Sequence, residues 1–336
     1  MSLEMAKTRP KTPAKSERRQ SPDRPRRARA VELVVRPPEL RCPVDATYEG
    51  DVFIWDLDKT YLRSEFGSLK DLVRTAFEKA RDKVAYPGAT PLLRGLRRDL
   101  AGRIRPIYFV SASPPQMREK VLEKLAIDGV EIDGIYFKDN IQNVRPGRMK
   151  RLREQMGYKL LALLDLRRHL PPGAVETMFG DDSETDAAVY STYSEILEGA
   201  LGGGALVELL DKQGVFHDES VRIAWRARSV GRRAAVRRVF ITMHKSVDPR
   251  YFHRFGSRVT GIRSYFQTAL LLAIDGVIDV ETTAKVADEV LARRPAQPTD
   301  LAREIRELRR QRSLDGPRAA DVLSKLGALG LLPATP

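Results

Sequence analysis

Only one cysteine, Cys42, occurs among the 336 residues. The chain therefore cannot form an intrachain disulfide or a cysteine-based zinc site, and this composition fits a reducing compartment. No apolar run approaches the ~20 residues that a membrane span requires, and the N-terminus lacks the apolar stretch of a secretory signal. We therefore expect a cytoplasmic protein without a transmembrane segment, one that at most binds peripherally to a membrane.

Histidine is also scarce, with four residues whose spacing matches no metal-ligand pattern. Positive charge is abundant: Lys and Arg outnumber Asp and Glu by 59 to 45, a formal net charge of +14. Such a charge is typical of proteins that bind nucleic acid or an anionic membrane. Much of the excess is arginine on predicted helix faces and in the N-terminal tail, where solvated charge is the usual explanation. The charge permits either partner without requiring one.

The predicted elements divide the chain into three parts. Residues 1–46 are rich in Lys, Arg, Pro and Ser, so we expect a basic, largely disordered tail. In residues 47–204 apolar strands alternate with helices over short links. This alternation predicts a domain of the α/β class, with a mostly parallel sheet between two layers of helices. Residues 205–336 are predicted as a C-terminal extension, first α/β and then helical.

Apolar runs and their flanking residues place the individual elements. Strands are predicted at 52–55, 105–110, 134–138, 175–179 and 238–243. Helices are predicted at 69–84, 92–100, 114–125, 148–156, 159–169, 219–228, 249–255, 262–274, 280–292, 301–314 and 319–326, with one more that ends near 198. Ser113 precedes two prolines and is interpreted as a helix cap. The glycines at 202–204 are interpreted as a hinge.

Two carboxylates follow the first predicted strand. Asp56 and Asp58 come directly after residues 52–55, and Thr60 follows them. In an open α/β sheet, ligands bind at the carboxyl ends of the strands. One carboxylate at that edge can act as a nucleophile while the other transfers protons. A simple turn after a strand would use the same residues, so the interpretation depends on what else reaches this edge.

Further polar groups follow other predicted strands. Ser111 ends the second strand, and Asp181, Asp182 and Asp186 follow the fourth. Lys159 begins the helix that leads into the fourth strand, so its ammonium group can point to the same edge. Carboxylates at one point repel unless a cation lies among them, and oxygen ligands without His or Cys favour Mg²⁺. Such a site attracts a phosphoryl group, whose oxygens need neutralising in the transition state.

These residues carry a family resemblance. The chain resembles the haloacid-dehalogenase-like (HAD) phosphohydrolases in four motifs that occur in the same order: Asp56-Leu-Asp-Lys-Thr, Ser111, Lys159 and Gly180-Asp-Asp with Asp186. A closer resemblance covers about residues 51–198. There the chain is similar to the catalytic domain of actin-patch-associated phosphatidate phosphatases and their bacterial relatives in the segments Tyr108-Phe-Val-Ser-Ala-Ser-Pro-Pro-Gln-Met, Tyr158-Lys-Leu and Phe179-Gly-Asp-Asp-Ser-Glu-Thr-Asp.

Three positions depart from that closer family. It usually has an acidic residue at Lys59, Gly at Ala112 and Ser at Asp182. These departures leave the superfamily chemistry intact and bear on the lipid substrate. The resemblance implies a HAD-like, Rossmann-type three-layer fold, with the catalytic domain at 47–204.

By position, the resemblance implies a role for each motif residue. Asp56 attacks phosphorus and gives a carboxylate oxygen to Mg²⁺. Asp58 protonates the leaving oxygen and then activates water, and its backbone carbonyl faces the metal. Ser111 holds a phosphoryl oxygen, and Lys159 neutralises charge on the nucleophile and on the phosphoryl group. Asp181 is the acidic metal ligand.

Other residues complete the implied site. The implied substrate-binding residues are Thr60, Ser111, Ala112 and Lys159. Asp182 is a further metal ligand or a helix cap. Asp186 is a candidate for direct or water-mediated contact, or a residue that favours a helix N-terminus through the dipole. Lys138 and Lys150 are rivals of Lys159 as the catalytic lysine.

The resemblance implies a Mg²⁺-dependent phosphatase that hydrolyses a phosphomonoester through an aspartyl-phosphate. The spans between the motifs are too short for a large cap domain, so we expect a minimal cap and a site open to a bulky phosphorylated substrate, a phosphatidate-like lipid first. Two alternatives stay open: a HAD-fold module that has lost catalysis and serves in binding or scaffolding, and a phosphatase that acts on nucleic-acid ends. His244, just past the strand at 238–243, is a candidate for the border of the pocket.

Overall fold

The computed structural model describes residues 40–63, 83–138, 148–182, 185–244, 246–293, 298–311, 314 and 316–332. The predicted basic tail lies almost entirely outside these residues. So do most of the helix predicted at 69–84 and much of the span in which a minimal cap is predicted. Every element described below belongs to a single unit of the chain, Leu33–Pro336.

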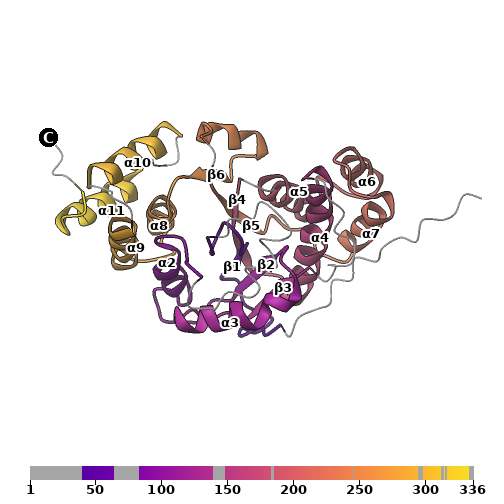
Figure 1. Cartoon of the computed structure of the whole chain (residues 1–336), viewed down its shortest axis with the longest axis horizontal. Helices are drawn as coiled ribbons and strands as arrows, with labels where there is room; N and C mark the ends of the chain where they lie inside the picture. The colour runs from indigo at the N-terminus through magenta and orange to yellow at the C-terminus, as the bar shows by residue number, and fades with distance from the viewer. Residues whose placement is uncertain are drawn as a thin grey trace, which may run out of the picture. The chain divides into compact units, whose positions relative to one another are not determined.

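A six-stranded, all-parallel sheet forms the centre of this unit, in the order β3-β2-β1-β4-β5-β6 (Figure 1). Its strands are β1 (Asp51–Trp55), β2 (Ile107–Ser111), β3 (Gly134–Phe137), β4 (Val175–Asp181), β5 (Val236–Thr242) and β6 (Val259–Ile262). The strands are mostly apolar runs because helices cover both faces. The chain order reverses between β1 and β4, and in such sheets the crevice at the reversal point binds ligands.

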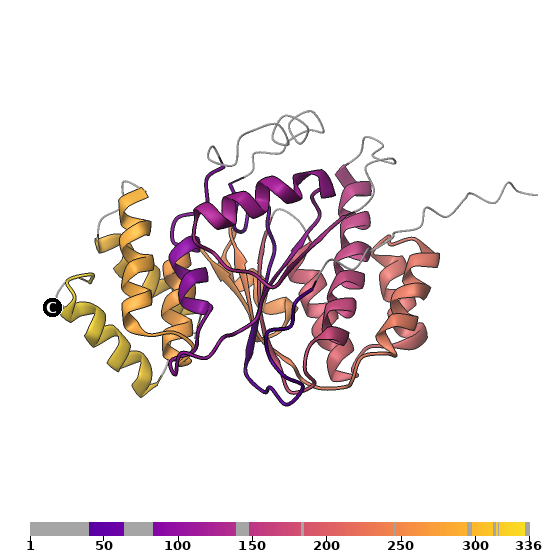
Figure 2. The same cartoon turned by 90° about the horizontal axis from the view of Figure 1, so that it is seen from below.

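Alternate residues of each strand face opposite helical layers. Phe53 and Trp55 of β1 pack into one apolar core, and Val52 and Ile54 pack into the other. The first core lies against α2 (Ala89–Leu96), α3 (Arg118–Ile127), α8 (Tyr265–Ile274), α9 (Val280–Arg293), α10 (Pro298–Arg310) and α11 (Pro317–Ala328). The second lies against α4 (Arg148–His169), α5 (Asp186–Glu198), α6 (Gly203–Lys212) and α7 (His217–Ala227). Figure 2 shows the same layers from below, and they confirm the predicted three-layer α/β fold.

Helix α4 runs without a break through Gly157, although the sequence predicts two helices separated at this glycine. That prediction is wrong because the glycine has a packing role. A Cβ at Gly157 would lie 2.9 Å from Oε2 of Glu219 on α7. The missing side chain therefore lets α7 approach α4 closely, and Lys159 is a mid-helix residue rather than the start of a helix.

Two further boundaries differ from the prediction. β6 and Ser264 occupy the start of the helix predicted at 262–274, and α8 begins only at Tyr265. The Ser264 hydroxyl accepts a hydrogen bond from the N–H of Phe266 at 3.2 Å and so caps α8. The glycines at 202–204 do not form a separate hinge, because α6 begins at Gly203. The described residues also include the short 3-10 helices η2 (Pro115–Met117) and η3 (Pro249–Phe255).

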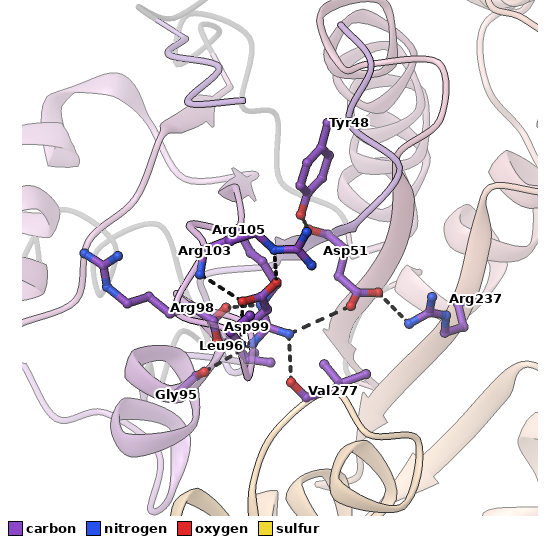
Figure 3. A network of polar contacts seen from close by, with 11 residues as sticks. Tyr48, Asp51, Gly95, Leu96, Arg98, Asp99, Arg103, Arg105, Arg237 and Val277 are labelled. Atoms are coloured by element: carbon purple, nitrogen blue, oxygen red, sulfur yellow. Dashed lines mark hydrogen bonds and ion pairs between the residues drawn. The ribbon is translucent and has the colours of Figure 1, made fainter. Parts of the chain in front are cut away.

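Arg105 connects three parts of the chain at the amino-terminal end of the sheet (Figure 3). Its buried guanidinium group donates to the carbonyl oxygens of Leu96 at 2.9 Å and Arg98 at 2.6 Å, at the end of α2 and just after it. A third bond, of 2.7 Å, reaches the carbonyl of Val277 in the loop after α8. A buried charge needs such acceptors. These bonds hold α2 and the loop after α8 against the sheet, at the end opposite to the strand tips.

The sheet continues past the predicted domain boundary at residue 204, because β5 and β6 extend it beyond β4. The division into a catalytic domain and an extension stays a prediction, but strands from both parts share one sheet. Across the described residues, no helix is at once long enough and apolar enough to cross a bilayer.

Candidate active site

The tips of β1 and β4 bring two predicted site residues together. The parallel register of these strands places Trp55 opposite Phe179. The N–H of Asp56 then donates to the carbonyl of Phe179 at 2.8 Å, which continues the pairing by one residue. Asp56 and Asp181 are both buried, with 1% and 0% of their surface exposed. The sheet thus presents two carboxylates inside the protein, at the reversal point of the strand order.

Three buried carboxylates and one ammonium group form the centre of the site. Carboxylate oxygens of Asp56, Asp181 and Asp186 lie within 4.8 Å of one another. Lys159 of α4 is fully buried; its Nζ donates to Oδ1 of Asp56 at 2.9 Å and also to Oδ1 of Asp186. With all four groups ionised, three negative charges face one positive charge. Burying such an imbalance costs free energy, so the cluster is suited to accept a cation.

The donor set of this cluster fits a divalent metal ion. Each of the three aspartates offers one oxygen ligand, and the three oxygens are close enough to share one ion. Carboxylate oxygens are the ligands that hard divalent cations prefer. Two further positive charges would also balance the four ionised groups. The buried aspartate triad can therefore hold a metal ion.

Gly180 gives Asp186 room to reach the cluster. A Cβ at position 180 would lie 2.5 Å from Oδ2 of Asp186, so a larger residue would displace that carboxylate. The same oxygen accepts from the N–H of Asp181 at 3.2 Å. From the sequence, Asp186 is only a nearby candidate for contact with the metal. Asp186 is the first residue of α5, directly after the loop from β4. This position could have indicated that its side chain turns back to the strand tip.

Asp58 is partly exposed and is held by two serines. Its Oδ2 accepts from Oγ of Ser111 at 3.3 Å and from Oγ of Ser113. The N–H of Ser113 donates in turn to Oγ of Ser111 at 3.0 Å. The prediction that Ser113 caps the next helix is wrong, because Pro114 is the cap residue of η2 and the serine hydroxyl is engaged by Asp58. Asp58 therefore has an environment different from that of Asp56, with hydroxyl donors and solvent contact.

The turn that carries Asp58 has an unusual backbone. Lys59 has a φ of +60°, which is uncommon for a residue with a side chain. The next residue, Thr60, is buried, and its carbonyl accepts from the hydroxyl of Tyr265 at 2.7 Å. The Thr60 hydroxyl makes no hydrogen bond to the part of the chain that the structure describes. A buried hydroxyl of this kind suits a bound ligand, and substrate binding by Thr60 stays a prediction.

Asp182, a predicted metal ligand, contacts β5. Its Oδ1 accepts from the N–H of His244 at 2.9 Å, and its own N–H donates to the carbonyl of Thr242 at 3.1 Å. Successive residues of an extended chain point to opposite sides, which explains why its neighbour Asp181 belongs to the buried triad and Asp182 does not. The metal role of Asp182 stays a prediction.

The remaining predicted residues lie at the same sheet edge or outside the residues that the structure describes. Ser111 is the last residue of β2, and Ala112 follows it. Of the three candidate lysines, Lys138 follows β3, and the side chain of Lys150 lies outside the described residues. The structure shows Lys159 bonded to two carboxylates of the triad, and its catalytic role stays a prediction.

Two tyrosines enclose the site from opposite helical layers. Tyr190 of α5 donates to the carbonyl of Phe179 at 3.2 Å, and Tyr265 of α8 donates to Thr60. Burial, and then the nearby carboxylate of Asp186, raise the pKa of Tyr190 well above its ordinary value. Burial also raises the pKa of Tyr265. Both phenols keep their protons at neutral pH and act as fixed donors. The sequence does not single them out, because a tyrosine on an apolar helix face predicts only core packing.

Comparisons with known proteins add a distant structural likeness. No family model matches the chain, and no curated protein matches it. A solved structure described as "Structure of Pnkp1/Rnl/Hen1 complex" is similar over 45% of this chain and 44% of that chain, with 12% identity and a TM-score of 0.29. The match thus spans less than half of that chain's length. A likeness at this level carries no argument about function, so the geometry of the site is what supports a proposal.

Proposed function

We propose that this protein is a Mg²⁺-dependent phosphatase that hydrolyses a phosphomonoester through an aspartyl-phosphate. The observation that carries the proposal is the contrast between the two carboxylates after β1. Asp56 is enclosed and bonded to the ammonium group of Lys159, whereas Asp58 is partly exposed among serine hydroxyls. Carboxylates with such different surroundings suit the separate roles of nucleophile and acid/base.

In the first step, a carboxylate oxygen of Asp56 attacks phosphorus while the bond from phosphorus to the leaving oxygen breaks. Asp58 gives its proton to that oxygen, so the product leaves as a neutral alcohol. In the second step, Asp58 takes a proton from water, and the water oxygen attacks phosphorus. The bond to Asp56 breaks and inorganic phosphate is released. Lys159 and the hydroxyl of Ser111 stabilise the negative charge of the phosphoryl oxygens.

Asp56, Asp181 and Asp186 would hold the metal ion, and the resemblance adds the carbonyl of Asp58 and the carboxylate of Asp182. When bound, Mg²⁺ supplies positive charge that neutralises phosphoryl oxygens. The triad of described residues offers only carboxylate oxygens, which favours this hard cation over zinc.

The proposed substrate is a phosphatidate-like lipid at an anionic membrane surface. This choice is supported by the family resemblance and by the net charge of +14, since each Lys or Arg near such a surface contributes about 1 kcal/mol. The same charge permits phosphorylated nucleic-acid ends, so both classes belong in the test. A module without catalysis would bind such ligands but leave them intact.

The test starts with p-nitrophenyl phosphate. Purified protein should hydrolyse it with Mg²⁺, lose activity in EDTA and regain it when Mg²⁺ is restored. Asp56→Asn, which removes only the charge, should lower kcat by about 10³-fold or more. Asp321→Asn, an identical change on the exposed face of α11, should have no effect. Equal activity of wild type and Asp56→Asn would overturn the proposal.

A substrate panel then separates the classes. Phosphatidate in mixed vesicles and oligonucleotides phosphorylated at the 5′ or the 3′ end are offered to wild type and Asp56→Asn. Turnover of phosphatidate that Asp56→Asn lacks would support the lipid proposal. Turnover of the oligonucleotides alone would contradict it. Binding without release of phosphate would favour the alternative of a module without catalysis.

A further inference from the structure

We propose that His244 is a positioning residue for Asp58, which it holds in place through the backbone carbonyl of Lys59. The inference rests on the proposed function, in which Asp58 is the acid/base. His244 lies just past β5, far from Asp58 in the sequence, and it is not part of the four motifs. From the sequence, it is only a candidate for the border of the pocket.

The bond from His244 ends on the turn between the catalytic carboxylate and Thr60. Nε2 of His244 donates to the carbonyl oxygen of Lys59 at 2.7 Å. A carbonyl oxygen only accepts hydrogen bonds, so the proton must be on Nε2. Among the described residues, Lys59 is the one with a positive φ that is not glycine. Such a conformation persists only where the surroundings hold it, and this bond is a direct means of holding it.

His244 is itself fixed from two further directions. Its backbone N–H donates to Oδ1 of Asp182 at 2.9 Å, which joins it to the tip of β4. Its ring lies 5.2 Å from the ring of Tyr86, at an angle of 36°. The N–H of Tyr86 donates to the carbonyl of Tyr61 at 2.9 Å, two residues after Lys59. His244 therefore connects the tips of β4 and β5 to the loop after β1, at the place where that loop carries the acid/base.

Loss of this bond has a specific chemical consequence. Without a donor at its carbonyl, the peptide of Lys59 can turn toward an ordinary conformation, and Asp58 then leaves its place beside Ser111 and Ser113. A misplaced acid matters most where the leaving oxygen needs a proton. An alkyl phosphate has such a leaving group, whereas p-nitrophenolate leaves readily as an anion. The loss should therefore depend on the leaving group.

The experiment measures kcat and KM for glycerol 2-phosphate and for p-nitrophenyl phosphate. His244→Ala removes the donor, and His244→Gln restores an N–H at a similar reach. His253→Ala, which removes an exposed histidine of η3, is the matched control. We expect His244→Ala to lower kcat on the alkyl ester at least about 10-fold more than on the aryl ester, with little change in KM. His244→Gln should recover most of the difference, and His253→Ala should equal wild type.

Three outcomes would overturn the inference while leaving the proposed function intact: unchanged kinetics in His244→Ala, equal losses on both esters, or a glutamine variant no better than alanine. Circular dichroism of each variant checks that the fold is kept, and the difference between the two esters within one variant does not depend on the folded fraction. A wild-type protein that hydrolyses neither ester would instead overturn the proposed function, and this inference with it.

Discussion

Replacing Asp181 by asparagine should stabilise the protein in the absence of divalent metal. Asp181 is the member of the triad to change, because the role implied for it is that of a metal ligand, whereas Asp56 is the proposed nucleophile. The charge of Asp181 is repelled by two carboxylates within 4.8 Å, and within the cluster Lys159 brings one positive charge to three negative ones. At that distance and an effective dielectric constant of about 20, one repulsion amounts to about 3.5 kcal/mol. Proton uptake and relaxation of the cluster reduce it, and we expect a gain of about 1–3 kcal/mol in the free energy of unfolding in EDTA.

Added Mg²⁺ should stabilise wild type more than Asp181→Asn. An ion that binds only the folded state stabilises it by about 2.7 kcal/mol at a hundredfold excess over its Kd. For a chain of 336 residues, this raises the unfolding midpoint by about 4 °C. Asp181→Asn lacks one of the three ligands and should gain less than half of this shift. The substitution should therefore raise the free energy of unfolding in EDTA and reduce the further increase that Mg²⁺ gives.

Urea unfolding followed by tryptophan fluorescence measures both effects. Trp55 is fully buried one residue before Asp56, and its ring stacks on that of Phe179 at 4.0 Å. The second tryptophan, Trp225, is 66% exposed, so a Trp225→Phe background isolates the buried reporter. Asp321→Asn is the control for a charge removed elsewhere. If Asp181→Asn is less stable than wild type in EDTA and both respond equally to Mg²⁺, the charge argument is refuted.

Two further predictions test the surroundings of the triad. Gly180→Ala should lower the free energy of unfolding by about 1–3 kcal/mol, because the new methyl group would lie 2.5 Å from Oδ2 of Asp186. Its phosphatase activity should fall by more than the loss of folded protein explains. Gly327→Ala is the control and should keep its activity, because no atom lies within 4 Å of an added Cβ there. The second concerns pH: the folded-state pKa values of Tyr190 and Tyr265 lie above the ordinary 10.0, so the unfolded chain loses these protons first. Stability should be complete below about pH 10 and fall above it, by at most about 1.4 kcal/mol per pH unit for each tyrosine. Urea unfolding across that range should show a shallower fall for Tyr190→Phe, and an identical fall would contradict the assignment.

The strand tips are predictable from the sequence because short apolar runs end abruptly in polar residues. The runs before Asp56 and Asp181 are of this kind, and parallel pairing brings both tips to one edge. The repeated alternation with helices also predicts the three-layer α/β fold, which the structure confirms. Hydrophobic periodicity and strand ends are local features of the sequence, so the strands and the fold class can be predicted without knowledge of any tertiary contact.

The direction in which a side chain turns is not predictable in the same way. Asp181 and Asp182 are neighbours in the sequence, yet one joins the triad and the other bonds to the N–H of His244. Ser113 has the sequence context of a helix cap, and its use by Asp58 depends on a strand from elsewhere in the chain. Gly157 predicts a break in α4 until its contact with α7 is known. Each of these errors concerns a residue whose role is decided by a distant partner.

The pairing of β4 with β5 has a consequence for how this protein can be divided. β4 bonds to β5 from Glu176 to Asp181, so a fragment that stops at residue 204 would turn β4 into an edge strand. Its outer row of N–H and C=O groups would then be open to a second copy, the usual origin of edge-to-edge aggregation. Asp181, the last residue of β4, would lie at the end of this unpaired edge strand. Residues 205–336 contribute none of the four motifs. Their removal would nevertheless cost the fragment both its solubility and an intact active site.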